Sequence, residues 1–548
     1  MATHAVHLRL VSMVKREQLV AVLCGALALV AAVDVRGQWT WVAGPDTPGA
    51  VPVYGPTGMF DPSYTPGAVY APGQCVDSLG RLWLFNGKLG QGINDLWCFD
   101  PAIAQWAWVS GGQGTNPAGS YGTKGVAAPT NLPKARGYAP AMWCDTVGDI
   151  WLFGGGGGEL EMNDLWRYQP SDGLWTWMHG DSTSGSEGVY GTLGVADPAN
   201  TPGRRYENTA TWRANDGSLW LYGGETMPFF QAYNDMWRFD PATGQWTWMH
   251  GAAGTGGGTS YGTLNVPSPT NSPGRRGVWT HWTDDAGRFW LFGGMVHGAN
   301  YPRNDLWMFD PESAQWTWKG GTTLDSDLGQ YGTPCVPGTA NIPPALFEAA
   351  AVWKDAAGRF YFQGGGYRNG TNGSLLREDV WRYDPVLSDW TWMWGSGVVN
   401  PPAVYGVLGT SSPLNTPGGR MGAVAIPSGD SLVYLYGGFD NAGQMHSDLW
   451  VLRTDELCAL ATEVPEKPAR LEVWYDGVLG LLYCSGPESI DHIAIHDAMG
   501  RMVFNRSVPQ VAGSTHALPL AQLPSGCWFV TASGPLGKYS ARITRVGQ

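Results

Sequence analysis

Short runs with apolar and aromatic residues are separated by turn-forming residues along this chain, and the runs come in groups of four. Residues 189–251 show one such group. The four strand-like runs are 206–212, 219–222, 234–239 and 246–249. Turn-forming residues separate the runs, for example Asp216-Gly217, and supply the positive φ values that tight turns need. Four short runs of this kind, joined by turn signals, predict four strands of one antiparallel sheet.

The same pattern recurs along most of the chain. Six copies of Asp-x-Trp begin at Asp95, Asp164, Asp235, Asp305, Asp379 and Asp448, at intervals of about 70 residues. In the first five copies a Trp-x-Trp segment follows about ten residues later. Both Trp rings of such a segment share one face of a strand. One sheet cannot bury them alone, so we expect neighbouring sheets to stack on each other.

The two ends of the repeat array are complementary. Trp39-Thr40-Trp41 is a fourth strand without the first three, and the copy at Asp448 has no Trp-x-Trp segment after it. Together they complete one sheet, which would close a ring without free edges. The sequence therefore predicts an all-β fold, with residues 38–458 forming a six-bladed β-propeller closed by an N-terminal strand.

Paired glycines that follow the second run of each copy resemble those of kelch repeats. They are Gly154-Gly155, Gly223-Gly224, Gly293-Gly294, Gly364-Gly365 and Gly437-Gly438, and the first copy has Asn86-Gly87 instead. The resemblance extends from residue 38 to about 453 and implies a kelch-type propeller. The period exceeds the usual kelch unit of about 50 residues. The additional residues fall in the loops between blades.

These loops have a constant length. They are 53–69, 120–136, 189–205, 260–276, 330–346 and 404–420. Each has Tyr-Gly at its second and third residues and a proline near its end. A constant length with Gly and Pro predicts an ordered structural loop rather than a linker.

The strand order predicts where a ligand binds. In a four-stranded meander the connections between strands 2 and 3 and between blades lie on one side of the ring, and the connections 1–2 and 3–4 lie on the other. The 2–3 loops vary in length and composition, and variable loops on a rigid scaffold commonly carry recognition. We therefore expect a protein or glycan ligand on that side. The candidate binding residues in these loops are Phe229, Phe230, Tyr233, Tyr301, Arg303 and Tyr367.

Four of the loops between blades end in arginine. These residues are Arg136, Arg205, Arg276 and Arg420, whereas Val69 and Leu346 interrupt the set. If strand 1 is innermost, the four guanidinium groups are expected to surround the axial opening and to bind carboxylate or phosphate. The alternative is that each arginine pairs with an acid or with carbonyls of a neighbouring blade.

Composition supports this interpretation and limits the chemistry. The chain has 30 Trp, 79 Gly and 39 Pro, with 14% charged residues. Its net charge of -13 and the lack of a basic run argue against nucleic acid. There is no Cys-x-x-Cys, metalloprotease or Walker motif, so we predict no metal, no cofactor and no catalytic residue. The repeated Asp of Asp-x-Trp indicates a structural role, which we expect to be turn capping.

The N-terminal 37 residues are typical of a signal peptide. Lys15 and Arg16 precede an apolar run from Leu19 to Val33, which is short for a membrane span. A buried helix is the alternative. Of the eight cysteines, Cys484 and Cys527 could form a disulfide in an oxidising space. The others are expected to be small core residues.

The repeat ends after Leu452. Residues 459–469 read as a linker, and 470–548 as a small β-sandwich. The segments 497–501 (Asp-Ala-Met-Gly-Arg), 523–526 (Leu-Pro-Ser-Gly) and 540–544 are similar to C-terminal sorting domains of the type nine secretion system of Bacteroidetes-like bacteria. The resemblance implies contact with export machinery and a secreted or outer-membrane surface location in a Gram-negative bacterium. A plain accessory sandwich is the alternative.

Three functions are compatible with these patterns. The preferred hypothesis is an exported binding module for protein or glycan. The second is a sugar-modifying propeller enzyme, resembling the sialic-acid mutarotases, that uses the axial arginines. The third, a copper enzyme resembling galactose oxidase, would require copper ligands from Tyr, His and a Cys-linked Tyr.

Overall fold

The computed structural model divides into two compact units, Met1–Ala459 and Leu460–Gln548. In the first, it describes residues 39–85, 92–114, 117–138, 140–157, 160–227, 231–277, 280–296, 301–347, 350–367 and 375–458. In the second, it describes 472–476, 481–485, 492–499, 501–507, 515–519, 526–534 and 537–545. The expected signal peptide 1–37 and linker 459–469 therefore lie outside the described residues. Every regular element within these ranges is a β-strand. The described residues contain no helix with the length and apolar character needed to cross a membrane.

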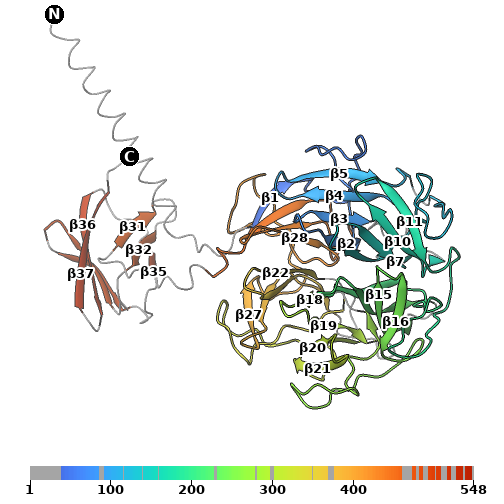
Figure 1. Ribbon diagram of the computed structural model, residues 1–548. Helices are drawn as coiled ribbons and strands as arrows, with labels where there is room; N and C mark the ends of the chain where they lie inside the picture. Colours follow the sequence, from blue (N-terminus) through green and yellow to red (C-terminus); the bar gives the residue numbers. More distant parts are fainter. Residues whose placement is uncertain are drawn as a thin grey trace, which may run out of the picture. The chain divides into compact units, whose positions relative to one another are not determined.

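Six antiparallel sheets follow one another in the described part of the first unit (Figure 1). Sheet 1 contains β2 (Gly73–Val76), β3 (Leu82–Phe85), β4 (Leu96–Asp100) and β5 (Gln105–Ser110). Sheet 2 contains β6 (Ala141–Cys144), β7 (Ile150–Phe153), β10 (Leu165–Gln169) and β11 (Leu174–His179). Sheet 3 contains β12 (Glu207–Arg213), β13 (Leu219–Thr226), β15 (Met236–Asp240) and β16 (Gln245–His250), with β14 (Gln231–Ala232) paired to β13.

The remaining three sheets have the same plan. Sheet 4 contains β17 (Arg276–Gly277), β18 (His281–Thr283), β19 (Phe289–Val296), β20 (Tyr301–Asp310) and β21 (Gln315–Gly320). Sheet 5 contains β22 (Ala351–Lys354), β23 (Phe360–Gln363), β26 (Val380–Asp384) and β27 (Asp389–Trp394). Sheet 6 contains β28 (Val424–Ser428), β29 (Leu432–Tyr436), β30 (Leu449–Arg453) and β1 (Trp39–Ala43). Two short hairpins complete the unit: β8 (Gly156–Gly157) with β9 (Leu160–Glu161), and β24 (Gly366–Tyr367) with β25 (Leu375–Leu376).

The N-terminal strand completes the last sheet, as the sequence predicts. β1 pairs antiparallel with β30, with Trp39 opposite Leu452 and Trp41 opposite Trp450. The Asn415 side-chain amide also donates to the Trp39 carbonyl, at 3.1 Å. The first described strand of the chain is therefore held by residues almost 400 positions away.

Apolar clusters join each sheet to the next in cyclic order. One cluster joins sheets 1 and 2, and four more join sheets 2 and 3, 3 and 4, 4 and 5, and 5 and 6. A sixth cluster joins sheet 6 back to sheet 1, where Val424 and Tyr436 pack with Trp97 and Trp106. Stacking every sheet on two neighbours buries the large Trp rings that one sheet would leave exposed. This arrangement is consistent with a β-propeller.

The loops between sheets are ordered and cover the sheet edges. In each loop, a backbone N–H donates to the carbonyl of the second Trp in the outermost strand of the same sheet. The pairs are Gly58–Trp108, Gly125–Trp177, Gly194–Trp248, Asn265–Trp318, Cys335–Trp392 and Gly409–Trp41, at 2.7–2.9 Å. A covered outer edge cannot pair with another chain. The prediction of an ordered structural loop is confirmed.

Two disulfides lie in the first unit. Cys75–Cys144 joins β2 to β6, and Cys335–Cys458 joins a loop between sheets to the segment after β30. The sequence predicts most of the cysteines to be small core residues and does not predict these two bonds. The side chains of the Cys484–Cys527 pair suggested by the sequence lie outside the described residues.

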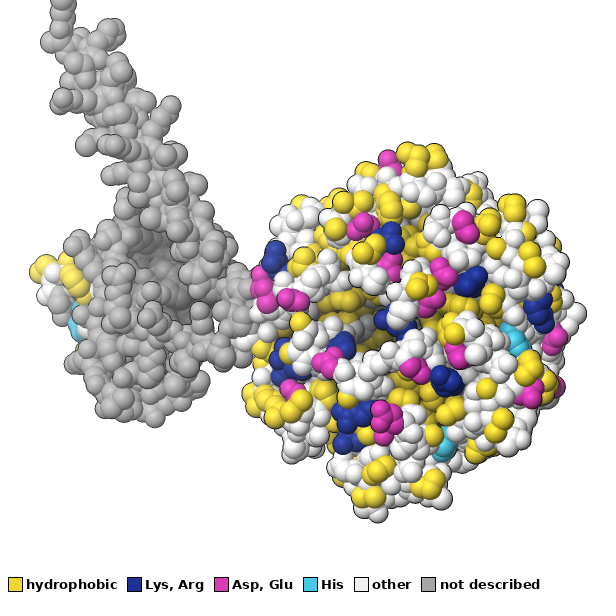
Figure 2. All heavy atoms as spheres, viewed as in Figure 1, with side chains coloured by type: hydrophobic (Ala, Val, Ile, Leu, Met, Phe, Trp, Pro, Cys, Tyr) yellow, Lys and Arg dark blue, Asp and Glu magenta, His cyan; other side chains and the backbone are white. Residues whose placement is uncertain are grey.

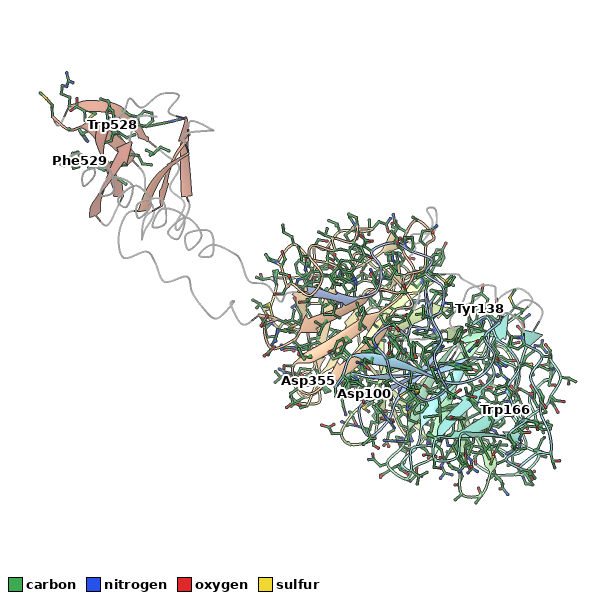
Figure 3. The ribbon with its side chains drawn as sticks, turned by 90° about the horizontal axis from the view of Figure 1, so that it is seen from above. Asp100, Tyr138, Trp166, Asp355, Trp528 and Phe529 are labelled. Carbon is green, nitrogen blue, oxygen red and sulfur yellow. A yellow bond between two sulfur atoms is a disulfide. The ribbon has the colours of Figure 1, made fainter. Side chains whose placement is uncertain are left out.

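The second unit contains two antiparallel sheets. The first has the order β31 (Glu472–Asp476), β32 (Leu481–Ser485), β35 (Thr515–Pro519). The second has the order β34 (Met502–Ser507), β33 (His492–Asp497), β36 (Gly526–Gly534), β37 (Gly537–Arg545). On β36, Trp528 is buried and Phe529 exposed (Figure 3), as alternation along a half-covered strand requires.

Candidate functional site

The four predicted arginines do not surround an opening. Each is at most 2% exposed, and each forms an ion pair with the aspartate of an Asp-x-Trp segment. The pairs are Arg136–Asp164, Arg205–Asp235, Arg276–Asp305 and Arg420–Asp448, with N–O distances of 2.6–2.8 Å. Charged groups this deeply buried require a partner. The expected arginine collar is therefore wrong. Each arginine is paired inside the fold, as the alternative held, but its partner belongs to the sheet that follows its own loop and not to a neighbouring one.

The aspartate in each pair connects three segments of its sheet. Asp235 accepts hydrogen bonds from the Tyr190 hydroxyl at 2.6 Å and from the Trp237 indole nitrogen at 2.8 Å. Both oxygens of the carboxylate also accept from Arg205 Nη2, at 2.7 and 2.8 Å. Tyr190 belongs to the loop before the sheet, so the carboxylate fixes that loop to the third strand. The role of the repeated Asp is structural, as expected, but it is this contact rather than turn capping.

The tyrosine of every loop makes this contact. The Tyr–Asp pairs are 54–95, 121–164, 190–235, 261–305, 331–379 and 405–448, at 2.6–2.9 Å. Burial opposes ionisation of Asp448, but the Arg420 guanidinium outweighs that effect and lowers the pKa of the carboxyl. In sheet 5, where Leu346 replaces the arginine, burial raises the pKa of Asp379 to about 6. In sheets 2, 3, 4 and 6, we call the group of Arg, Asp, Tyr and Trp the Arg–Asp cluster of that sheet.

The structure does not gather the other predicted residues into one site. The Tyr233 ring is buried with its centroid 3.6 Å from the Arg205 guanidinium carbon, where the stacking is internal. Tyr367 is buried and donates to the Ser326 carbonyl at 2.9 Å. Arg303 pairs with Asp325 at 2.8 Å, and Tyr301 is 40% exposed. Phe229 and Phe230 lie outside the described residues.

A cavity of about 760 Å³ lies instead among the innermost strands of the six sheets. Its walls come from β2, β6, β12, β18, β22 and β28, with further residues from the 1–2 turns. Figure 3 labels one residue of a 1–2 turn, Asp355, and one residue of a 3–4 turn, Asp100. The 2–3 loops contribute no residue to the cavity wall in the described part of the chain. Its volume is in the range of small-molecule sites.

One half of the wall is polar. β12 contributes Thr209, Thr211 and Arg213 at alternate positions, and β18 contributes His281 and Thr283. Alternation places the residues of each set on one face of its strand. The backbone N–H of Thr211 lies 3.3 Å from His281 Nε2, which fixes the imidazole between two strands.

The cationic groups of this half differ in their partners. Lys354 of β22 forms an ion pair with Asp285 at 2.8 Å. Arg213 donates from Nη1 to the Cys144 carbonyl at 2.9 Å, and no described carboxylate forms an ion pair with it. Its remaining N–H groups are therefore available to a ligand in the cavity. On the face shown in Figure 2, basic side chains border a hollow near the centre of this unit.

The other half of the wall is largely apolar. It is formed by the Cys75–Cys144 disulfide with Val76, Met142, Val352, Ala425 and Pro427. A cavity with one polar and one apolar side orients a ligand that has the same two characters.

Sequence reasoning missed this cavity. Its signal is the alternation of Thr209, Thr211 and Arg213 with the buried Ala210 and Trp212. That pattern shows that one face of the strand is polar, but it does not show that six such faces meet.

One catalytic motif is present in the sequence without the matching structure. Residues 258–262 read Gly-Thr-Ser-Tyr-Gly, the pattern of a hydrolase nucleophile turn. Ser260 lies in a loop between sheets and pairs through its backbone with Ser272. The motif requires a turn from a strand into a helix, and this loop lies between two strands. Ser260 is therefore a loop residue.

No family model and no curated protein matches the chain. Among solved structures, the one titled "Structure of YjhT" aligns at 13% sequence identity with a TM-score of 0.42. The alignment covers 70% of this chain and 95% of that one.

Proposed function

We propose that the first unit is a six-bladed kelch-type propeller that acts as an exported binding module for a glycan. The observation that carries this proposal is the cavity of about 760 Å³ with one polar and one apolar half. Threonine hydroxyls, an imidazole and a guanidinium suit the hydroxyl groups of a sugar. The cyclic packing of six sheets and the pairing of β1 with β30 support the ring architecture.

Binding by the full chain to a glycan panel tests the proposal. Thr211→Trp places a large ring in the cavity, and Thr192→Trp, on an exposed loop, is the matched control. We expect Thr211→Trp to abolish binding and the control to retain it, with both variants melting within a few degrees of the wild type.

Two other results would lead to different conclusions. Binding that survives Thr211→Trp but is lost in Tyr301→Ala would place the ligand on the 2–3 loops, where the sequence predicts a protein or glycan partner. Conversion of a bound sugar to a product would favour the sugar-modifying enzyme over a binding module.

We also propose that the chain is exported and that the second unit is the sorting domain. The two disulfides support an oxidising compartment, since such bonds are rare in the cytosol. Expression in a bacterium with a type nine system, with and without residues 470–548, tests this proposal. Equal amounts of both forms outside the cell would overturn the sorting role.

A further inference from the structure

Arg213 differs from the other arginines of its surroundings. Arg205, in the same sheet, pairs with Asp235, and Arg238 pairs with Asp216. Arg213 lies between these in the sequence and has only a carbonyl as hydrogen-bond acceptor among the described residues. A guanidinium group has five N–H donors, so most of its hydrogen-bonding capacity is unused.

The position of Arg213 places its unused N–H donors at the cavity. Arg213 lines the axial cavity at the end of β12, close to the 1–2 turns. The other cation of the wall, Lys354, is already neutralised by Asp285. Asp284, the remaining acid of the wall, is engaged by Arg288 at 2.7 Å. The unneutralised charge of the described cavity wall is therefore the positive charge of Arg213.

Hydroxyl groups surround the same space. Thr209, Thr211 and Thr283 face the cavity from two adjacent strands, and Gln74 faces it from β2. Hydroxyls and amides both donate and accept, which matches a ligand with several hydroxyl groups. Arginine forms bidentate hydrogen bonds with carboxylate and phosphate oxygens.

We propose that the cavity binds a hydroxyl-rich ligand that carries an anionic group, and that Arg213 is the residue that binds this group. The inference rests on the proposed function, because it specifies the ligand class of the same cavity. Carboxylate and phosphate share the required chemistry. The threonines bind the hydroxyls, and the side with Met142 and Val76 contacts the least polar part of the ligand.

The test measures binding of three matched probes to the full chain by titration calorimetry. The probes are galactose, galacturonate and galactose 6-phosphate, which differ in the group at carbon 6. We expect at least one anionic probe to bind 10-fold or more tightly than galactose. A preference between the two anionic probes identifies the anionic group.

Three variants assign the effect to the residue. Arg213→Ala should remove the preference for the anionic probe, whereas Arg213→Lys should keep only part of it, since an ammonium group lacks the planar fork. Arg238→Ala removes a surface arginine from the same sheet and should change nothing. Arg213 is exposed, so we expect an unchanged melting temperature in each Arg213 variant.

The outcomes separate this inference from the proposed function. If galactose binds as well as the anionic probes and Arg213→Ala has no effect, the inference is wrong and a binding cavity remains. If the anionic preference survives Arg213→Ala, another residue binds the anion and the assignment is wrong. If none of the three probes binds, the inference is overturned, and the glycan panel with Thr211→Trp decides separately on the cavity.

Discussion

Replacing Arg276 by leucine tests whether the Arg–Asp clusters stabilise the fold. Arg276 is fully buried and donates to both oxygens of Asp305, at 2.7 and 3.1 Å. It also donates to the Gly293 carbonyl at 3.0 Å and to the Pro273 carbonyl. Leucine is a suitable replacement because Leu346 occupies the equivalent position before sheet 5.

The expected cost follows from the burial of Asp305. Removing one partner of a buried ion pair leaves an uncompensated charge, which costs about 3–5 kcal/mol. Adding Asp305→Asn removes that charge, so the double variant should recover to within about 2 kcal/mol of the wild type. Urea unfolding followed by Trp fluorescence measures both values.

The cost should also depend on pH. Burial raises the pKa of Asp379, which stands in a sheet where Leu346 replaces the arginine, to about 6. Arg276→Leu leaves Asp305 buried without an arginine at that position, as Asp379 is, so we expect the variant to recover stability as the pH falls below 6. A loss of less than about 1 kcal/mol at pH 7, or a loss that is equal at pH 5 and pH 7, would refute the structural role.

Three further predictions concern other parts of the fold. The raised pKa of Asp379 contributes stability that is present below about pH 4 and is lost as the pH rises through 6. The free energy of unfolding in urea should therefore fall by roughly 3 kcal/mol between these limits in the wild type, and Asp379→Asn should remove this fall. The same dependence of unfolding free energy on pH in Asp379→Asn and in the wild type would contradict this prediction. Cys458→Ser opens a crosslink spanning 123 positions and should lower stability by up to about 5 kcal/mol in urea unfolding without reductant, where Cys75–Cys144 stays intact; a stability equal to that of the wild type would contradict this. Trp39→Ala removes a ring that is 1% exposed and should cost about 3–5 kcal/mol in thermal unfolding, whereas Trp41→Ala, which is half-buried, should cost less.

The sheets and their closure could be predicted because their signals are local and repeated. Alternation sets each strand, and turn residues separate the strands. The isolated Trp39-Thr40-Trp41 segment has a unique complement at the other end of the array. Its pairing with β30 therefore follows from counting strands, without any knowledge of side-chain packing.

The arginines were misplaced because alternation does not identify which face of a strand meets the axis. Arg205 is the last residue of a loop, where its side chain reaches Asp235, next to the third strand, instead of the opening. A signal was present, since the Arg and the Asp repeat with one period and a recurrent buried acid requires a partner. Val69 and Leu346 obscured it by breaking the arginine set.

The axial cavity could not be predicted for a different reason. Its wall combines one strand face from each of six sheets separated by about 70 residues. Thr209 and Arg213 are an ordinary polar face of a strand when β12 is considered alone. Only the ring brings them opposite Met142 and Val352, and this arrangement depends on the number of sheets.

The turn between β33 and β34, which is part of the resemblance to sorting domains, has the same hydrogen bonds as turns in the first unit. The Asp497 carboxylate accepts from the backbone N–H of Met499 and Arg501, both at 2.9 Å, and from Arg501 Nε at 2.8 Å. The first unit repeats this arrangement in the turns Asp77–Arg81, Asp284–Arg288 and Asp355–Arg359.

An Asp-x-x-Gly-Arg hairpin turn is thus explained by its own hydrogen bonds, wherever it occurs in this chain. Residues 497–501 therefore do not distinguish a sorting domain from any other antiparallel sheet. The resemblance then depends on 523–526 and 540–544, of which 523–525 lie outside the described residues. If substituting residues 540–544 leaves export unchanged, while deleting 470–548 abolishes it, export requires the second unit but not this motif.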